Sequence, residues 1–139
     1  MKVKTAKFNL KTKGVNDIID ITHNINAIIK EEQFKEGNVL IFVPGATAGI
    51  STIEYEPGLL NDYPNFMDRI IPINGFYRHN DTWGDGNGYA HVRATLQGPS
   101  IIVPFINSEM ILGTWQQIIL LEFDNRPRNR EIIVQLTGI

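Results

Sequence analysis

Two histidines bracket a glycine-rich, acidic turn between residues 77 and 93, where potential ligands and proton carriers are denser than anywhere else in this chain. His79 and His91 can bring their imidazoles together only if the intervening turn folds back. The glycines at positions 84, 86 and 88 make this reversal feasible, because glycine adopts backbone conformations that other residues avoid. Imidazole nitrogens suit both metal coordination and proton transfer near neutral pH. The sequence therefore places any chemistry at this turn.

Three interpretations of the turn stay open: a divalent metal site, a metal-free acid–base or anion site, and a purely structural turn. Two imidazoles and a carboxylate can hold a metal while leaving positions open for substrate and water. A helix–loop–helix calcium loop that starts at Asp81 is excluded, since Trp83 and Val92 would then occupy ligand positions without offering a side-chain oxygen. A dinucleotide fingerprint and a P-loop are absent as well. The available third partners are the carboxylates Asp81, Asp85, Glu54 and Glu56.

Other segments supply groups that bind anions or planar ligands. The small residues 44–49 follow a buried strand, and their amides are suited to phosphate or carboxylate, although a tight strand connection explains them equally. Arg93 can clamp an anion, although a lone arginine on a strand usually faces solvent. Trp115 can form the floor of a pocket in which Gln116 bonds a ligand, although a buried tryptophan is more often core. The basic turn at 124–130 predicts a solvated hairpin.

The composition is that of one soluble domain spanning residues 1–139. A net charge of -2 gives no basic footprint, which argues against a nucleic-acid partner. The absence of cysteine excludes disulfides and thiolate chemistry and fits a reducing cytoplasm. No apolar run approaches the roughly 18 residues of a membrane helix, and the N-terminus lacks the apolar core of a signal peptide. We expect a cytoplasmic protein with no membrane partner.

Hydrophobic periodicity predicts an α+β domain, namely a mixed or antiparallel β-sandwich with about two helices packed on it. Apolar steps of three and four predict an amphipathic helix from residue 16 or 17 to about 32, on which His23 is solvated. A second helix is expected over 59–71, where Pro64 interrupts or kinks it. The last two strands should form a terminal hairpin. Strands are expected at 3–10, 39–43, 50–56, 90–96, 101–106, 114–123 and 131–136.

Taken together, several of these segments resemble the YjbQ family, also catalogued as UPF0047. The resemblance starts at about residue 38, covers most of the chain from there on, and keeps the family's order. One departure matters: many members read Pro-His-Thr-Thr-Ala where this chain reads Pro44-Gly-Ala-Thr-Ala48, so a three-histidine site is unavailable. The matching stretches are 43–50, 54–56, Tyr77-Arg-His79, 84–91, Arg93-Ala94, 96–100, 112–116 and 122–124.

The resemblance implies a compact α+β domain that assembles as a homotrimer. Family members are sometimes described as secondary thiamine-phosphate synthases, which join a pyrimidine diphosphate to a thiazole phosphate with loss of pyrophosphate. Such a reaction needs a cation, usually Mg²⁺ or arginine, to stabilise the departing pyrophosphate. Carried over position by position, the implied site comprises Thr47, Glu54, His79, Asp85, Asn87, His91, Trp115 and Gln116.

Competing hypotheses follow for the function. The first is an enzyme that acts on a phosphorylated small molecule, with a Zn or Mg ion on His79, His91 and Asp85 as the metal variant. The second is a non-catalytic homo-oligomer that holds a metal or anion at the same residues, and the third is an assembly protein whose cluster only ties subunits together. For the enzyme, the expected catalytic groups are His79, His91, Glu54 and Asp85, and the expected ligand-binding groups are Thr47, Asn87, Arg93, Trp115 and Gln116.

Overall fold

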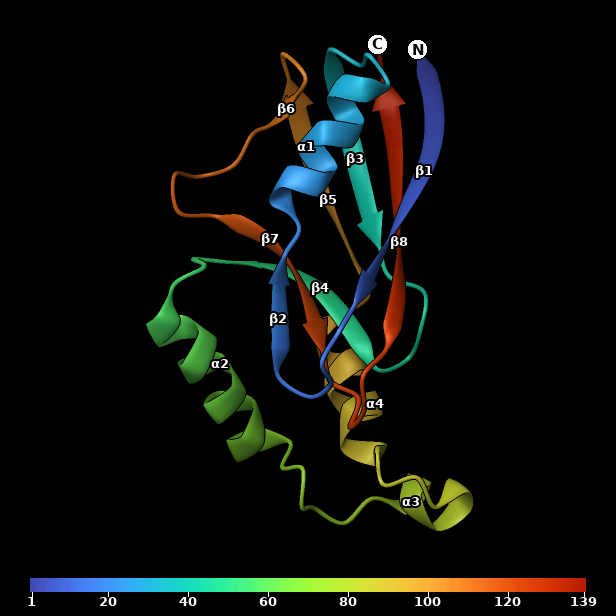
Figure 1. The fold of residues 1–139 in the computed structure, drawn as a ribbon, viewed down its shortest axis with the longest axis vertical. Helices are drawn as coiled ribbons and strands as arrows, with labels where there is room; N and C mark the ends of the chain where they lie inside the picture. Colours follow the sequence, from blue (N-terminus) through green and yellow to red (C-terminus); the bar gives the residue numbers. More distant parts are fainter.

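Residues 1–139 are all described by the computed structural model, which contains two antiparallel sheets and four helices (Figure 1). The larger sheet has the order β1-β8-β3-β5-β6 and the smaller one the order β2-β7-β4. The strands are β1 (Lys2–Lys11), β2 (Asp17–Asp20), β3 (Glu36–Phe42), β4 (Ala48–Ile53), β5 (Ser100–Ile106), β6 (Glu109–Met110), β7 (Gln117–Glu122) and β8 (Asn129–Gly138). The helices are α1 (Thr22–Glu31), α2 (Pro57–Ile70), α3 (Arg78–Trp83) and α4 (Gly88–Gln97).

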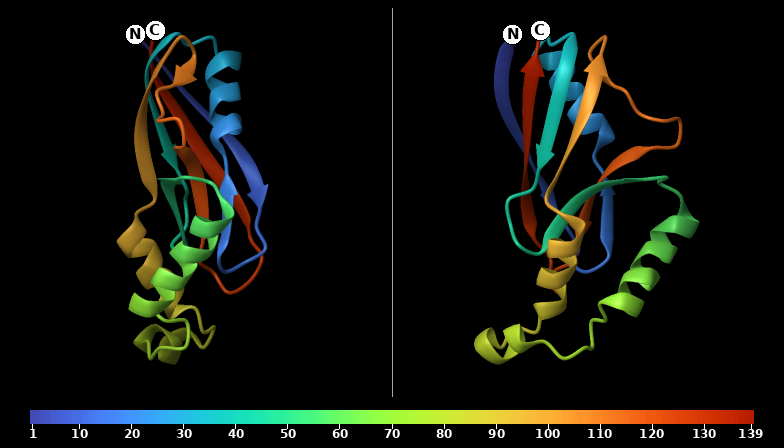
Figure 2. Two further views of the ribbon diagram at one scale, coloured as in Figure 1. Left: turned by 90° about the vertical axis from the view of Figure 1, so that its left-hand side faces the viewer. Right: turned by 180° about the vertical axis from the view of Figure 1, so that it is seen from behind.

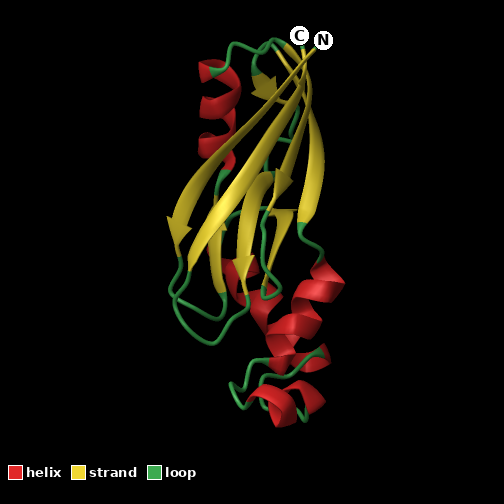
Figure 3. Cartoon of the chain, turned by 90° about the vertical axis from the view of Figure 1, so that its right-hand side faces the viewer, coloured by secondary structure: helices red, strands yellow, loops and turns green.

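The main core lies between the two sheets and beneath α1. Its 17 buried apolar residues come from α1, from strands of both sheets and from the adjoining segments that hold Ile21, Phe34 and Val43. Ile25 and Ile29, one turn apart on α1, are fully buried in it, whereas His23 on the opposite side of the helix is exposed, as predicted. Figure 3 shows α1 alongside the curved strands near the chain termini and the other helices at the opposite end. The predicted sandwich with helices on it is confirmed.

A second core covers the other face of the smaller sheet. Ile119 and Leu121 of β7 point into it and pack with residues of α2 and α4, while Ile118 and Leu120 point into the main core. This strand is therefore buried on both faces, which explains why the run 114–123 lacks the alternation of a half-buried strand. The smaller sheet thus forms a middle layer between the larger sheet and the α2–α4 helices.

The predicted strand at 90–96 is wrong, because these residues belong to α4. Tyr89, Ala90, Arg93 and Ala94 are its buried residues, a spacing that follows one side of a helix. Residues 90–96 also alternate between apolar and polar side chains, and this two-residue period favoured a strand over a helix. Short α3 precedes it, and both helices stand at the end of the sheets away from the termini (Figure 2). The chain therefore has four helices instead of about two.

Two further boundaries differ from the prediction. The first helix begins only at Thr22, because residues 17–20 form strand β2. This strand pairs with β7, so that Ile18 lies opposite Leu121 and Ile19 opposite Leu120. The β-branched Ile18 and Ile19 suit this strand better than a helix. The terminal hairpin is also wrong, since β7 and β8 belong to different sheets. The basic turn between them crosses from one sheet to the other.

Other expectations hold. The first strand is β1, paired only with β8 at the edge of the larger sheet, and the apolar run 39–43 contributes to β3, which has a strand on each side. Helix α2 continues through Pro64, with its first turn capped by the Glu56 carboxylate, which accepts the amides of Gly58 and Leu59. None of the four helices combines the length and the apolarity needed to cross a bilayer.

Candidate functional site

The structure brings the two histidines of the glycine-rich turn into contact. His79 lies on α3 and His91 on α4, and the centroids of their rings are 4.3 Å apart with the planes tilted by 40°. A left-handed Gly84 ends α3 and lets the chain reverse before α4 begins. The reversal on which the site hypothesis depends is therefore present.

Close packing between α3 and α4 holds this reversal in place. A Cβ atom on Gly88 would lie 2.6 Å from Cβ of Tyr77, so only glycine allows the two segments to approach. The amide of Gly88 donates to Oδ1 of Asn80 at 2.9 Å, and Nδ2 of Asn125 donates to the carbonyl of Asp85 at 2.9 Å. The turn is thereby tied to itself and to the β7–β8 connection, which fixes where the imidazoles lie.

Nδ1 of His79 is buried and has no hydrogen-bond partner. The nearest carboxylate oxygen, Oδ1 of Asp85, lies 3.8 Å away, which is too long for a hydrogen bond. Half of the Asp85 side chain stays exposed. A buried imidazole nitrogen without a partner is costly, and such groups occur where a ligand or a proton is to be received. Nδ1 of His79 is therefore open to a ligand or a proton donor.

Burial and the neighbouring His79 lower the pKa of His91, against a smaller opposite effect of Asp124 and Asp85. Two imidazolium ions in ring contact would repel each other, so this ring prefers to be neutral. A neutral imidazole at physiological pH can accept a proton, and it can also bind a cation. The geometry and charge of the pair thus suit acid–base chemistry.

The lowered pKa of His91 predicts a pH-dependent stability for the metal-free protein. The unfolded chain takes up this proton near the ordinary pKa of 6.5, whereas the folded chain takes it up only at lower pH. The free energy of unfolding should therefore fall as the pH drops below about 6.5, and His91→Gln should flatten this slope. Urea unfolding at several pH values measures how the free energy of unfolding changes with pH, and His23→Gln is the control for an exposed histidine. An unchanged slope in His91→Gln would contradict the assignment.

Thr47 and Asn87 lie in a buried polar network centred on Asp124. Oγ1 of Thr47 donates to Oδ2 of Asp124 at 3.1 Å, and Nδ2 of Asn87 donates to Oδ1 at 3.3 Å. Arg128 donates to Oδ2 through Nε at 2.7 Å. Burial alone would raise the pKa of Asp124, but the hydrogen bonds from Arg128, from the Asn125 amide, from Asn87 and from Thr47 outweigh it and lower the pKa. Asp124 therefore stays ionised beside the histidines.

A second ion pair extends the network into the core. Nε and Nη2 of Arg130 donate to the two carboxylate oxygens of Glu122, Nη2 also donates to Oγ1 of Thr47 at 2.8 Å, and the hydroxyl of Thr12 donates to Glu122 at 2.7 Å. Glu122 is fully buried and the Arg130 side chain nearly so. The network, named here the Glu122–Asp124 network, consists of Thr12, Thr47, Asn87, Glu122, Asp124, Arg128 and Arg130.

The solvated hairpin expected at 124–130 is wrong in this respect. Arg126 is exposed, but Arg128 is partly buried and Arg130 is buried by the ion pairs just described. A sequence signal for this network existed: two acids end an apolar strand at 122 and 124, and two arginines follow at 128 and 130. Opposite charges on adjoining segments can neutralise each other when both are buried.

Arg93 lies on α4 and is fully buried. Its Nε and Nη2 donate to the carbonyl of Ile71 at 3.1 and 2.9 Å, and Nη2 approaches Oδ1 of Asp68 at 3.4 Å. The side chain thus ties α4 to the end of α2. The expectation of an arginine on a strand that faces solvent is wrong, while its predicted role as a ligand clamp stays a prediction.

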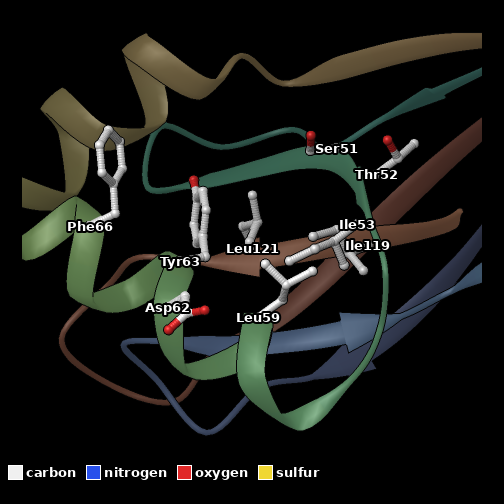
Figure 4. A pocket seen from close by; sticks show the side chains of 9 residues that line it. All are labelled: Ser51, Thr52, Ile53, Leu59, Asp62, Tyr63, Phe66, Ile119 and Leu121. Atoms are coloured by element: carbon white, nitrogen blue, oxygen red, sulfur yellow. The ribbon is translucent and has the colours of Figure 1, made fainter. Parts of the chain in front are cut away.

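Helix α4 meets the beginning of β4, near Gly49, whereas Glu54 follows its last residue, which pairs with Gln117. Trp115 and Gln116 directly precede Gln117, so they lie with Glu54 at the end of β4 away from α4. All three are exposed, and Nε2 of Gln116 donates to Oγ1 of Thr52 at 3.3 Å. A cavity of about 310 Å³ begins at Thr52 and runs between α2 and the smaller sheet. Figure 4 shows Tyr63 and Leu59 of α2 across it from Ile53, Ile119 and Leu121. Two of the five predicted ligand-binding groups, Trp115 and Gln116, and the predicted catalytic Glu54 therefore lie apart from the imidazoles within one chain.

Three hollows open around the histidine pair. One of about 210 Å³ has His91 on one side and the loop residues Gly45 and Ala46 among its other walls. Another, of about 300 Å³, is entirely polar and lies over Arg128, Asn87 and Asp85. A shallower one follows α4 past His91. His91 and the loop residues Gly45 and Ala46 thus line one hollow, and Asp85 and two residues of the network line another.

The family follows from comparison with known proteins. A family model described as "UPF0047 protein YjbQ-like" matches residues 6–139. The chain belongs to the YjbQ family. A UPF0047 protein of Archaeoglobus fulgidus is 39% identical over 129 residues, covering 93% of this chain and 98% of the relative. A UPF0047 protein of Methanothermobacter thermautotrophicus is 36% identical and covers 99% of this chain and 94% of its own.

Solved structures agree with the fold. A YbjQ-like protein of unknown function from Sulfolobus solfataricus superposes with a TM-score of 0.89 at 29% identity, covering 99% of this chain and all of the other. An uncharacterized YjbQ/UPF0047 protein from Clostridium acetobutylicum gives a TM-score of 0.85 at 33% identity, covering 95% of this chain and 99% of the other. The YjbQ-like architecture expected from the motifs is therefore confirmed.

A metal on His79, His91 and Asp85 fits the donor types but not a finished coordination shell. Within one chain, no three His, Asp or Glu side chains come close enough together to hold an ion. The unpartnered Nδ1 of His79 and the neutral His91 offer two nitrogen donors. A third donor would require Asp85 to move or an external ligand to bind. The Zn or Mg site stays a prediction.

Proposed function

We propose that this protein is a cytoplasmic enzyme that acts on a phosphorylated small molecule bound over the His79–His91 pair. The observation that carries the proposal is the contact between the two imidazoles beside solvent-reachable hollows. A lone buried histidine is usually structural, but two rings in contact, one with an unpartnered buried nitrogen, are poorly explained by packing alone.

In this proposal His91 is the proton acceptor, since its lowered pKa keeps it neutral. His79 lies against it and can pass a proton to Asp85, whose carboxylate is 3.8 Å away and free to swing. The phosphate group is attracted by Arg126 and Arg128, which line the polar hollow with Asn87. The side chains of Thr47 and Asn87 hold Asp124 in place and so position Arg128.

The family resemblance narrows the reaction to a thiamine-phosphate-synthase-like transfer, in which pyrophosphate leaves as the new carbon–nitrogen bond forms. The departing pyrophosphate needs positive charge, and Arg126 and Arg128 supply it. A divalent Zn or Mg ion on His79, His91 and Asp85 would add Lewis-acid charge when bound. The resemblance also supports a homotrimer. The resemblance also predicts site roles for Glu54, Trp115 and Gln116, and the sequence predicts one for Arg93.

A second candidate function is a non-catalytic, homo-oligomeric protein that binds a metal or anion at the same cluster. The observation that favours it is the small number of proton-carrying groups near the rings, since Glu54 lies at the far end of β4. Under this alternative a ligand binds but is released unchanged. Product analysis after incubation with a bound phosphorylated metabolite separates the two candidates.

The proposal predicts that at least one phosphorylated metabolite raises the melting temperature of the purified protein. A thermal-shift screen of such metabolites, with elemental analysis of the same preparation, measures ligand and metal together. At a ligand concentration of about 100 times the dissociation constant, the stabilisation should approach roughly 2.7 kcal/mol. The His23→Ala variant should respond like the parent chain. A screen in which no phosphorylated compound shifts the melting temperature would contradict the proposal.

A further inference from the structure

One edge of the Arg130 guanidinium is left without a partner. Nε and Nη2 are both engaged by Glu122, and Nη2 also donates to Thr47, but Nη1 makes no hydrogen bond within the chain. The residue is only 7% exposed, yet Nη1 is not among the polar atoms sealed from solvent. Nη1 is therefore a donor without a partner in the chain that an acceptor from solvent can reach.

Gly45 leaves this nitrogen open. A Cβ on residue 45 would lie 3.0 Å from Nη1 of Arg130, and no other heavy atom beyond the loop itself lies within 4 Å of that point. The φ angle of Gly45 is +133°, a conformation that a residue with a side chain rarely adopts. Gly45 is itself exposed. The chain thus keeps a gap through which a solvent-borne group can reach the guanidinium.

The loop around this gap offers unpartnered donors. The backbone N–H groups of Gly45, Ala46 and Thr47 donate to no group of the protein. Gly45 and Ala46 also line the hollow of about 210 Å³ that His91 faces. The neighbouring acids cannot act as acceptors for these donors, since Glu122 is occupied by Arg130 and Thr12, and Asp124 by Arg128, Asn87 and Thr47. What complements such a set is an acceptor-rich anion.

We infer that Nη1 of Arg130 and the amides of residues 45–47 form an oxyanion subsite beside His91. It would receive a carboxylate or terminal phosphate oxygen of the ligand. This inference deepens the proposed function, on which it rests for the remainder of the ligand. Arg130 binds the anion directly, Glu122 orients the guanidinium, and Gly45 admits the ligand. The pair of Arg130 and Glu122 has no net charge, so the subsite recognises the oxyanion by directed N–H groups and leaves long-range attraction to Arg126.

Titration with inorganic phosphate, and separately with acetate, tests the subsite in the parent chain and three variants. Gly45→Ala places a methyl group over Nη1, and Arg130→Lys removes the bidentate fork and Nη1 with it; each should weaken phosphate binding by about tenfold or more. Glu131→Gln is the matched control, because Glu131 follows Arg130 on β8 but pairs with Lys7 at the surface, and it should bind within about twofold of the parent. Calorimetry gives the affinities, and the Nε–H resonance of Arg130 reports contact with the ion.

Equal phosphate affinity in Gly45→Ala, Arg130→Lys and the parent would overturn the inference, and so would a parent chain that binds neither ion. Circular dichroism checks that Gly45→Ala is folded before its affinity is compared with that of the parent. If Gly45→Ala does not fold, Arg130→Lys alone tests the subsite. Stronger binding of acetate than of phosphate would assign the subsite to a carboxylate. If phosphate binds through Arg130 but no phosphorylated metabolite depends on His79 or His91, the proposed function fails and the subsite stands. If a phosphorylated metabolite depends on His79 and His91 but phosphate does not bind through Arg130, the subsite is refuted and the proposed function stands.

Discussion

A chain that carries both His79→Ala and His91→Ala is expected to bind phosphorylated ligands and divalent metal at least about a hundredfold more weakly than the parent. Each imidazole contributes a hydrogen bond or metal bond to the ligand, and a bond that involves a charged partner is worth about 1.5–3 kcal/mol. Two such losses multiply. Isothermal titration with the compound found by thermal shift, and elemental analysis of the purified variant, measure the two effects.

The fold should survive this double change. His79 lies in the first turn of α3 and His91 in the first turn of α4. The side chain of His79 is 30% exposed. His23→Ala is the matched control, because this third histidine is exposed on α1 and belongs to neither core. If the double variant keeps the parent's affinity while its circular dichroism is unchanged, the histidine pair is not the ligand site.

Replacing Glu122 by alanine is expected to have the largest effect on stability, a loss of about 3–5 kcal/mol in the free energy of unfolding. The carboxylate is fully buried and accepts from Arg130 and Thr12, so its removal leaves a guanidinium in the core without a counter-charge. Urea unfolding monitored by circular dichroism measures the change. The slope with denaturant should stay the same if the native fold persists.

Glu131→Ala provides the comparison on the same strand. Glu131 lies one residue after Arg130, but its ion pair with Lys7 spans 3.6 Å at the surface. Removing an exposed pair of this kind should cost about 0–1 kcal/mol. If Glu122→Ala were no more destabilising than Glu131→Ala, the ion pair between Glu122 and Arg130 would not be the structural centre of the network.

The histidine turn could be predicted because its information is local. Glycines at short spacing between two histidines permit a reversal of the chain, and the structure brings the ring centroids to 4.3 Å. The strands with clean patterns were predicted for the same reason, β1 from its alternation and β3 from its apolar run. Ordered motifs along the chain were sufficient for the family, which the match over residues 6–139 confirms.

The Glu122–Asp124 network could not be predicted from patterns of this kind. Charged residues in a turn look solvated, and whether they are buried depends on β7 and β8 belonging to different sheets. That topology is set by long-range packing, since β8 pairs with β1 and β3. Helix α4 was missed for a related reason: its Arg93 looks like a polar position until Ile71 and Asp68 are seen beside it.

Within one chain, the residues of the implied site lie in two separate regions. Thr47, Asp85 and Asn87 lie around the histidines or in the network beside them, whereas Glu54, Trp115 and Gln116 lie at the other end of β4. Motif order along the chain carries no distances, so it could not show that these residues lie in two regions of one chain. Only the topology of the smaller sheet separates them.

The most direct test of the shared histidine site follows the imidazole nitrogens by ¹⁵N NMR during titration with a phosphorylated metabolite that the thermal-shift screen identifies. The account predicts that nitrogens of His79 and His91 shift together, with one dissociation constant, while those of His23 stay unmoved. Resonances of His79 and His91 that remain in place at saturating ligand would contradict it.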